Sequence, residues 1–402
     1  MAAGIGLLRG ALAVPVAYLT VLTAAAWVAT VRPRRRPGSP GGRSFALLVP
    51  AHDEEDVIGE TLAALLALEY PASLRSVHVI ADHCTDATVD IALACGVEVH
   101  RRDGVIRGKG PGLASVIDEL TSDASGAPPD AFVIVDADTI VAPGFLDAVD
   151  QAMAGGSAAV QGQYRVRDPG ASTGAGLRAA ALTLRHHLRP LGRTTLGASS
   201  GLYGNGMAFR RELLQGRAWT NHLTEDIEMQ MELLLEGTLV AYAPDAVVEA
   251  EMPATLGGAV TQNERWERGR LDLARRYIPV LARATVDRRG RQRVAAADAL
   301  LDHLVPPLSV LVAAVGGVTV AQLAVTAVRR DRFARSAVVL PVAIVVHVAS
   351  GLVLGRAPAS VYRSLIHAPA MVVWKVRLWA RMLGGGDDDV AWVRTARTGT
   401  AP

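Results

Sequence analysis

A seven-residue stretch, Phe132-Val-Ile-Val-Asp-Ala-Asp138, constrains the fold of this chain more than any other. Its four leading apolar residues predict a buried strand, and ligands of an open α/β sheet bind beyond the carboxyl ends of such strands. Alternate residues of an extended chain point the same way, so Asp136 and Asp138 can face one divalent cation. Two carboxylates suit Mg²⁺ or Mn²⁺ when substrate phosphates supply further ligands. A solvated acidic turn is the alternative, and the flanking segments decide between the two.

The composition indicates a membrane-associated protein rather than an ordinary soluble enzyme. Hydrophobic residues make up 50% of the 402 positions, and the excess is concentrated at the two ends of the chain. A net charge of +2 gives no indication of nucleic-acid binding. Only Cys84 and Cys95 occur, which argues against a disulfide framework and fits a reducing compartment.

Three uncharged apolar runs are long enough to predict membrane spans. Residues 11–31 form a run of about 20, and the arginines that follow it predict an uncleaved anchor with its C-terminal side in the cytoplasm. A cleaved signal peptide would carry its charge before a shorter apolar core. Residues 304–328 and 336–354 predict two more spans. The arginines between these two runs would then lie outside, so a re-entrant or interfacial run stays open as an alternative.

Strand and helix patterns alternate through the middle of the chain. Strands are predicted at residues 44–50, 76–81, 97–100 and 132–135, with a further strand at 158–164. This alternation predicts a mostly parallel sheet with right-handed crossovers. Polar residues gather where successive strands end, which is typical of nucleotide-binding proteins.

Two glycine-containing segments and one acidic segment come next in importance. A basic, glycine-rich turn at residues 107–112 opens a helix, and the small residues of 198–206 would let the backbone approach a sugar or phosphate closely. Simple turn glycines would explain the second segment equally well. Thr224 is a plausible N-cap for the helix that follows it, and Asp226 could serve only the dipole of that helix.

A later helical segment presents three side chains on one face. Gln262, Arg265 and Trp266 are three and four residues apart, so an amide, a guanidinium and an indole lie together. Such a face suits an anionic phosphate and a sugar ring. The alternative is a basic amphipathic helix lying on the membrane, which is also the prediction for residues 359–383.

Six motifs in this order resemble those of membrane-bound family 2 glycosyltransferases, the group of cellulose, chitin and hyaluronan synthases and bacterial exopolysaccharide synthases. The resemblance covers residues 44–280, and residues 392–397 are similar to the cytosolic tail of bacterial members. The motifs are Val49-Pro-Ala-His-Asp-Glu54, Ile80-Ala-Asp-His-Cys-Thr-Asp86, Gly108-Lys-Gly110, Asp136-Ala-Asp138, Thr224-Glu-Asp226 and Gln262-Asn-Glu-Arg-Trp266.

The resemblance implies a GT-A-type α/β fold and an inverting transfer from a nucleotide-diphosphate sugar, with a UDP-sugar as the expected donor. It places Ala51, Glu54 and Asp82 around the base and ribose. Lys109 and Asp136 would hold the nucleotide, and Asp138, with Asp136, would bind Mg²⁺ or Mn²⁺. The implied general base is Asp226, with Glu225 beside it. Gln262, Arg265 and Trp266 would contact the leaving diphosphate and the acceptor sugar.

The chemistry needs no protein nucleophile, because the acceptor hydroxyl attacks the anomeric carbon while a carboxylate removes its proton. The expected product is a β-linked exopolysaccharide, and a single transfer to a polyprenyl or glycolipid acceptor is the alternative. Three spans are few for a polymer channel, so a homo-oligomer or an export partner is a further expectation. His52-Asp53 departs from the usual aromatic-asparagine pair of the first motif. A nucleotidyltransferase and a non-catalytic scaffold are competing interpretations.

The sequence thus predicts a multi-pass protein of the cell membrane with a cytoplasmic catalytic domain, in contact with membrane lipid. The predicted organisation is an N-terminal transmembrane helix (1–31), a basic linker (32–43), the GT-A domain (44–280), an interfacial connector (281–303), two transmembrane helices (304–355), and an interfacial helix with a cytoplasmic tail (356–402).

Overall fold

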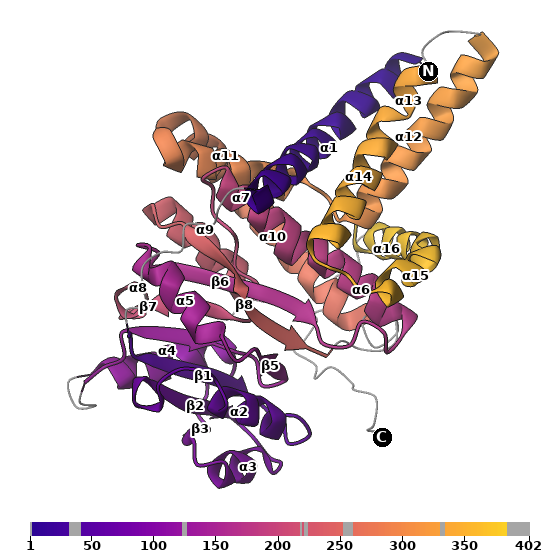
Figure 1. The fold of residues 1–402 in the computed structure, drawn as a ribbon. Helices are drawn as coiled ribbons and strands as arrows, with labels where there is room; N and C mark the ends of the chain where they lie inside the picture. Colours follow the sequence, from indigo (N-terminus) through magenta and orange to yellow (C-terminus); the bar gives the residue numbers. More distant parts are fainter. Residues whose placement is uncertain are drawn as a thin grey trace. The chain divides into compact units, whose positions relative to one another are not determined.

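The computed structural model describes residues 2–31, 42–122, 127–217, 219–220, 224–251, 260–329 and 334–383. The chain forms two compact units, and each unit is built from separate segments (Figure 1). The sheet unit comprises Pro33–Arg167 and Ser199–Glu251. The helical unit comprises Met1–Arg32, Asp168–Ala198 and Met252–Pro402. The tail motif at residues 392–397 lies outside the described residues.

The sheet unit contains a mixed sheet of eight strands in the order β3-β2-β1-β4-β7-β6-β8-β5. The strands are β1 (Phe45–Ala51), β2 (Arg75–Asp82), β3 (Glu98–Arg102), β4 (Ala131–Ile134), β5 (Thr139–Val141), β6 (Ala159–Val166), β7 (Met207–Arg210) and β8 (Val240–Ala250). Strands β3, β2, β1 and β4 pair in parallel, as do β6 and β8. Strand β7 is antiparallel to both of its neighbours, and β5 is antiparallel to β8.

The predicted parallel arrangement is therefore confirmed for the first four strands along the sheet. The strands β5, β7 and β8 were not anticipated from the sequence. Three residues of β5 and four of β7 are too few to show a period-2 pattern, and their direction depends on partners far away in the chain.

Helices cover both faces of this sheet because side chains alternate along each strand. Leu47 and Val49 of β1 pack with apolar residues of α2 (Ile58–Leu66) and α5 (Phe145–Ala154). Ala46 and Leu48 point to the opposite face and pack with α4 (Lys109–Thr121) and α9 (Glu225–Glu236). The shorter helices of this unit are η1 (Ala72–Leu74), α3 (Thr88–Ala94) and α8 (Arg211–Leu214).

The helical unit contains most of the apolar residues from the two ends of the chain. Its helices are α1 (Ala2–Val31), α6 (Thr173–Thr183), the π-helical turn η3 (Leu184–Leu188), α7 (Arg189–Thr195), α10 (Val260–Asp287), α11 (Gly290–Leu304), α12 (Leu308–Arg329), α13 (Ala334–Ala337), α14 (Val339–Leu354), α15 (Ala359–Ser364), η4 (Leu365–His367) and α16 (Ala368–Leu383).

Helices α1, α12 and α14 pack side by side (Figure 1). At one end of α1, Arg9 donates to Gln322 near the end of α12 and to Ser336 just before α14. Fourteen residues later, Thr23 contacts His347 of α14 at 2.7 Å. Helix α14 therefore runs in the same direction as α1, and α12 runs in the opposite direction.

Two of these helices are long and apolar enough to cross a membrane, judged by length and composition. They are residues Gly4–Val31 of α1 and Leu308–Ala327 of α12. Helix α14 is equally apolar but has only 16 residues, against the roughly 20 that a perpendicular span needs. The second C-terminal span therefore stays a prediction.

A buried polar cluster joins three segments of the helical unit that are distant in sequence. Arg193 of α7 donates through Nε to Asp298 of α11 at 2.6 Å, and both side chains are almost fully buried. The hydroxyl of Tyr18 in α1 donates to the other oxygen of Asp298 at 2.9 Å. A buried ion pair of this kind holds its partners in one arrangement, because removing either group would leave a desolvated charge.

The start of α4 in the sheet unit depends on two glycines. Gly108 has a φ of 127°, a conformation that side chains with a Cβ atom rarely adopt. Gly110 lies so close to the backbone carbonyl of Thr220 that a Cβ atom on Gly110 would overlap with it. Gly104, only six residues earlier, has open space around it. The two positions therefore allow a matched comparison.

We expect Gly110→Ala to lower the free energy of unfolding by about 1–3 kcal/mol, the usual cost of overpacking, because a backbone carbonyl cannot move aside as a side chain can. Gly104→Ala should stay within about 0.5 kcal/mol of the wild type. Thermal unfolding of the two purified variants measures the difference. Equal melting temperatures for both variants would contradict the close contact between α4 and Thr220.

Candidate functional site

Parallel pairing brings the residues of several sequence motifs to one edge of the sheet. Strands β1, β2 and β4 are aligned in parallel, so their carboxyl ends lie next to one another. Ala51 is the last residue of β1, and Asp82 is the last residue of β2. Asp136 and Asp138 lie in the short segment between the end of β4 and the start of β5. The sheet therefore places these residues at the edge where open α/β sheets bind their ligands.

Lys109 connects three segments of this edge. Its ammonium group donates to Asp136 Oδ1 at 2.6 Å and to the carbonyl oxygen of Gly204 at 2.7 Å. Burial disfavours the charged ammonium, but the neighbouring carboxylates, Asp136 foremost, raise the pKa of Lys109 above its ordinary value. Lys109 is therefore a fixed positive charge among acidic groups.

Asp226 approaches the same place from the amino end of α9. Gly204 has a φ of 77°, and a Cβ atom built on it would lie 3.6 Å from Asp226 Oδ2. The carboxylates of Glu225 and Asp226 also raise the pKa of Lys109. The structure thus brings Asp226, Lys109 and Asp136 together around the backbone of Gly204. Thr224 occupies the N-cap position as predicted, although its side chain makes no capping hydrogen bond.

A buried network that the sequence analysis did not identify fixes the loop at 198–206. The side-chain oxygen of Asn205 accepts from the backbone N–H of Asp136 at 3.2 Å, and its amide donates to Thr139 at 2.7 Å. Gln161 of β6 donates to the Asn205 carbonyl at 2.8 Å and accepts from the N–H of Tyr203 at 3.0 Å. Asn205 and Gln161 are fully buried. No pattern in the sequence singled out Gln161, because the same strand also contains Gln163 and Arg165.

Asp82 supports the start of α4 through both of its oxygens. Oδ2 accepts from the N–H of Gly108 at 2.8 Å, and Oδ1 accepts from Arg102 at the end of β3 at 3.0 Å. Asp82 therefore binds the backbone of Gly108, the residue that directly precedes Lys109. The carboxylate that the resemblance assigns to the nucleotide base also positions the glycine-rich turn.

The segment after β1 is tied to the segment after β2. Asp53 has a φ of 54°, and its carboxylate accepts from the N–H of Thr85 at 2.6 Å. His52 Nδ1 contacts the Asp82 carbonyl at 2.7 Å, and the N–H of Glu54 donates to Thr88 at 2.7 Å. The unusual His52-Asp53 pair thus has a structural role in joining these two loops.

The charge of this edge suits a divalent cation. Three carboxylates, those of Asp136, Glu225 and Asp226, act on the ammonium of Lys109, and Asp138 follows Asp136 by two residues. Asp136 and Asp138 are both partly exposed, so each can bind a ligand from solvent. Oxygen ligands are what Mg²⁺ and Mn²⁺ prefer, so this donor set fits such an ion.

The remaining predicted residues belong to the helical unit. Gln262 and Arg265 lie on α10, and their side chains are outside the described residues. Trp266, next on the same helix, is 36% exposed. Their proposed contacts with diphosphate and acceptor stay predictions.

Comparisons with known proteins identify the family and the fold of this chain. A chain similar to the present one is a β-monoglucosyldiacylglycerol synthase of Synechocystis, 26% identical over 56% of this chain and 47% of that protein. Another is a poly-β-1,6-N-acetyl-D-glucosamine synthase of Staphylococcus epidermidis, 25% identical over 56% of this chain and 54% of that protein. The chain spans about half the length of the curated relatives it matches.

Among solved structures, a mannosyltransferase from Pyrobaculum calidifontis, solved with GDP-mannose and Mn²⁺, has a similar fold. The TM-score is 0.53 at 18% identity, and the match covers 86% of this chain and 99% of that one. A family model described as glycosyltransferase-like family 2 matches residues 40–269. That match covers more than half of the chain, so the protein belongs to the family 2 glycosyltransferases, with a GT-A-type fold.

Proposed function

We propose that the protein is a membrane-integral inverting glycosyltransferase that moves a sugar from a nucleotide-diphosphate donor, with UDP-sugar as the expected class, to a growing β-linked exopolysaccharide. The observation that carries the proposal is the convergence of Asp136, Lys109 and Asp226 around Gly204. A base and a phosphate-binding group must act on the same sugar from different directions, and these residues come from three separate segments.

The donor would bind across the carboxyl ends of the parallel strands. Ala51, Glu54 and Asp82 follow or end the strands β1 and β2 and are proposed to contact the base and ribose. A Mg²⁺ or Mn²⁺ ion held by Asp136 and Asp138 would neutralise charge on the departing diphosphate. Lys109 adds a positive charge on the same side, since its ammonium already binds Asp136.

Asp226 is the proposed general base. It would accept the proton of the acceptor hydroxyl as that oxygen attacks the anomeric carbon and the bond to the diphosphate breaks. Its position at the amino end of α9 favours a carboxylate in its charged form. Glu225, the preceding residue of the same turn, would assist by orienting the acceptor. Gln262, Arg265 and Trp266 are proposed to contact the diphosphate and the acceptor sugar.

The membrane location is part of the proposal. Helices α1 and α12 meet the length and composition requirements of spans, and α14 packs against both. The C-terminal end of α1 leads into the arginine-rich residues 32–36, which favours a cytoplasmic catalytic domain. Membrane lipid would surround these helices, and a second copy or an export partner would complete a polymer channel.

The first test measures release of free nucleoside diphosphate from a panel of nucleotide sugars by detergent-purified protein, with membrane lipids as a source of acceptor. We expect turnover with one donor class and a fall of about a hundredfold or more in Asp226→Asn, because a positioned base is lost. Glu236→Gln, at the other end of the same helix, is the matched control and should keep wild-type turnover. Asp226→Asn with wild-type turnover would exclude this assignment, and pyrophosphate release would indicate a nucleotidyltransferase.

The second test concerns the metal. Excess chelator should abolish turnover, and added Mg²⁺ or Mn²⁺ should restore it. Asp138→Asn should raise the Mg²⁺ or Mn²⁺ concentration needed for half-maximal turnover by roughly 10-fold or more, because one of two carboxylate ligands is weakened. Asp118→Asn, an exposed aspartate on α4, should leave this concentration unchanged. Full turnover in excess chelator would rule out a metal-dependent reaction.

The third test separates extension from a single transfer. The similarity to a polysaccharide synthase and to a glycolipid synthase makes both acceptor classes reasonable. We expect a ladder of products that lengthens with time, and β-linkages by NMR when the donor is α-linked. A single product that partitions with lipid would favour the polyprenyl or glycolipid alternative. Retention of the donor's anomeric configuration would contradict the inverting mechanism.

A further inference from the structure

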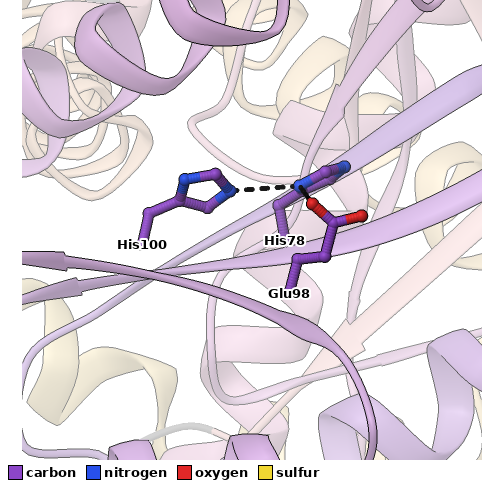
Figure 2. A group of neighbouring side chains, drawn as sticks. All are labelled: His78, Glu98 and His100. Atoms are coloured by element: carbon purple, nitrogen blue, oxygen red, sulfur yellow. Dashed lines mark hydrogen bonds and ion pairs between the residues drawn. The ribbon is translucent and has the colours of Figure 1, made fainter. Parts of the chain in front are cut away.

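The strands β2 and β3 bring two histidines and a glutamate to one point on the sheet. The two strands are parallel, with His78 opposite Glu98 and Ile80 opposite His100. Glu98 and His100 are two residues apart, so their side chains share one face of the edge strand β3. Figure 2 shows the two imidazole rings and the carboxylate directed toward one another.

The distances between these groups match those between ligands of a tetrahedral metal ion. His78 Nδ1 is 3.1 Å from His100 Nε2 and 3.4 Å from Glu98 Oε2. Three ligand atoms, one from each residue, lie within 4.8 Å of one another. Ligand atoms about 2.0–2.1 Å from a tetrahedral Zn²⁺ are separated by roughly 3.3 Å, which is close to both distances measured from His78 Nδ1.

His78 Nε2 and His100 Nδ1, the ring nitrogens that face away from the cluster, each have a partner that can accept a proton. The other nitrogen of each ring then has a lone pair available for a metal ion. His100 Nδ1 contacts Glu119 Oε2 at 3.1 Å, and a carboxylate can only accept, so the proton of neutral His100 is on Nδ1. Its Nε2 therefore offers a lone pair. His78 Nε2 contacts the hydroxyl of Ser76 at 2.7 Å, and this oxygen can accept a proton donated from Nε2. Metal-binding histidines are usually oriented by such contacts.

The cluster is separate from the proposed catalytic edge. His78 precedes Asp82 by four residues of β2, a distance of about 13 Å along a strand. His78 is buried, whereas the side chain of Glu98 is 64% exposed and leaves a route from solvent. Among the residues that the structure describes, these three are the one group of at least three histidine, cysteine, aspartate or glutamate side chains with the spacing of metal ligands.

We propose that His78, Glu98 and His100 form a Zn²⁺ site, with water as the fourth ligand, that fastens the edge strand β3 to β2. Two imidazoles and a carboxylate are a typical zinc donor set, and imidazole disfavours Mg²⁺. Strand β3 ends two residues later at Arg102, which holds Asp82 and through it the start of α4. The ion would therefore stabilise the side of the sheet on which the glycine-rich turn rests.

The test measures Zn²⁺ binding to the full-length, detergent-purified protein by competition with a chromophoric chelator, in excess Mg²⁺ and in the Asp138→Asn background. These conditions suppress binding at Asp136 and Asp138. We expect one Zn²⁺ per chain, and at least a hundredfold weaker binding in His78→Ala/His100→Ala. With Co²⁺ in place of Zn²⁺, the intense visible absorption of a tetrahedral complex should appear in the parent and not in the double variant.

Two further variants keep the result interpretable if the double variant does not fold. Glu98→Gln changes an exposed side chain, so it should fold normally and still weaken Zn²⁺ binding about 10-fold or more. Asp118→Asn carries the same change in charge on the adjacent helix and should bind Zn²⁺ like the parent. Zinc should also raise the melting temperature of the parent by more than that of Glu98→Gln, because the variant binds the ion more weakly. Unchanged zinc affinity in Glu98→Gln, or absence of a tetrahedral Co²⁺ spectrum in the parent, would overturn the proposal and leave a hydrogen-bonded histidine pair.

Discussion

The contact between Lys109 and Asp136 is the interaction on which the arrangement of the candidate site depends. It joins the amino end of α4 to the segment that follows β4, and the same ammonium group binds the Gly204 carbonyl. Because the lysine is surrounded by carboxylates, its positive charge is favoured despite burial. The ammonium group of Lys109 therefore links three segments that are distant in the chain: the start of α4, the segment after β4 and the loop at 198–206.

Backbone proximity is the second constraint on this site. Gly110 lies against the carbonyl of Thr220, and a Cβ atom on Gly204 would lie 3.6 Å from Asp226 Oδ2. Gly206, with a φ of 64°, lies against Val248 of β8. A side chain at Gly110 or Gly206 would push apart elements that are in contact, so these glycines have a packing role. At Gly204 the positive φ of 77° is what favours glycine. The buried side chains of Asn205 and Gln161 then fix the loop at 198–206 through hydrogen bonds.

Side-chain hydrogen bonds also link the apolar helices of the helical unit. Arg9 is bound by Gln322 and Ser336, and Thr23 pairs with His347. Such contacts specify which helices are neighbours, since an unpaired polar group in an apolar environment is costly. They explain how helices drawn from the two ends of the chain form one unit.

The sequence by itself determined the family, the parallel half of the sheet and the positions of the acidic motifs. It could do so because buried strands and their polar ends leave a local pattern, as in Phe132–Asp138. Only the tertiary structure decided the antiparallel places of β5 and β7, the support of Asp136 by Asn205, and the meeting of His78 with His100. These features depend on pairing between residues far apart in the chain. A local pattern carries no information about which distant strand will become the neighbour. The hydrogen bonds and side-chain contacts between two such strands therefore exist only once the sheet has formed.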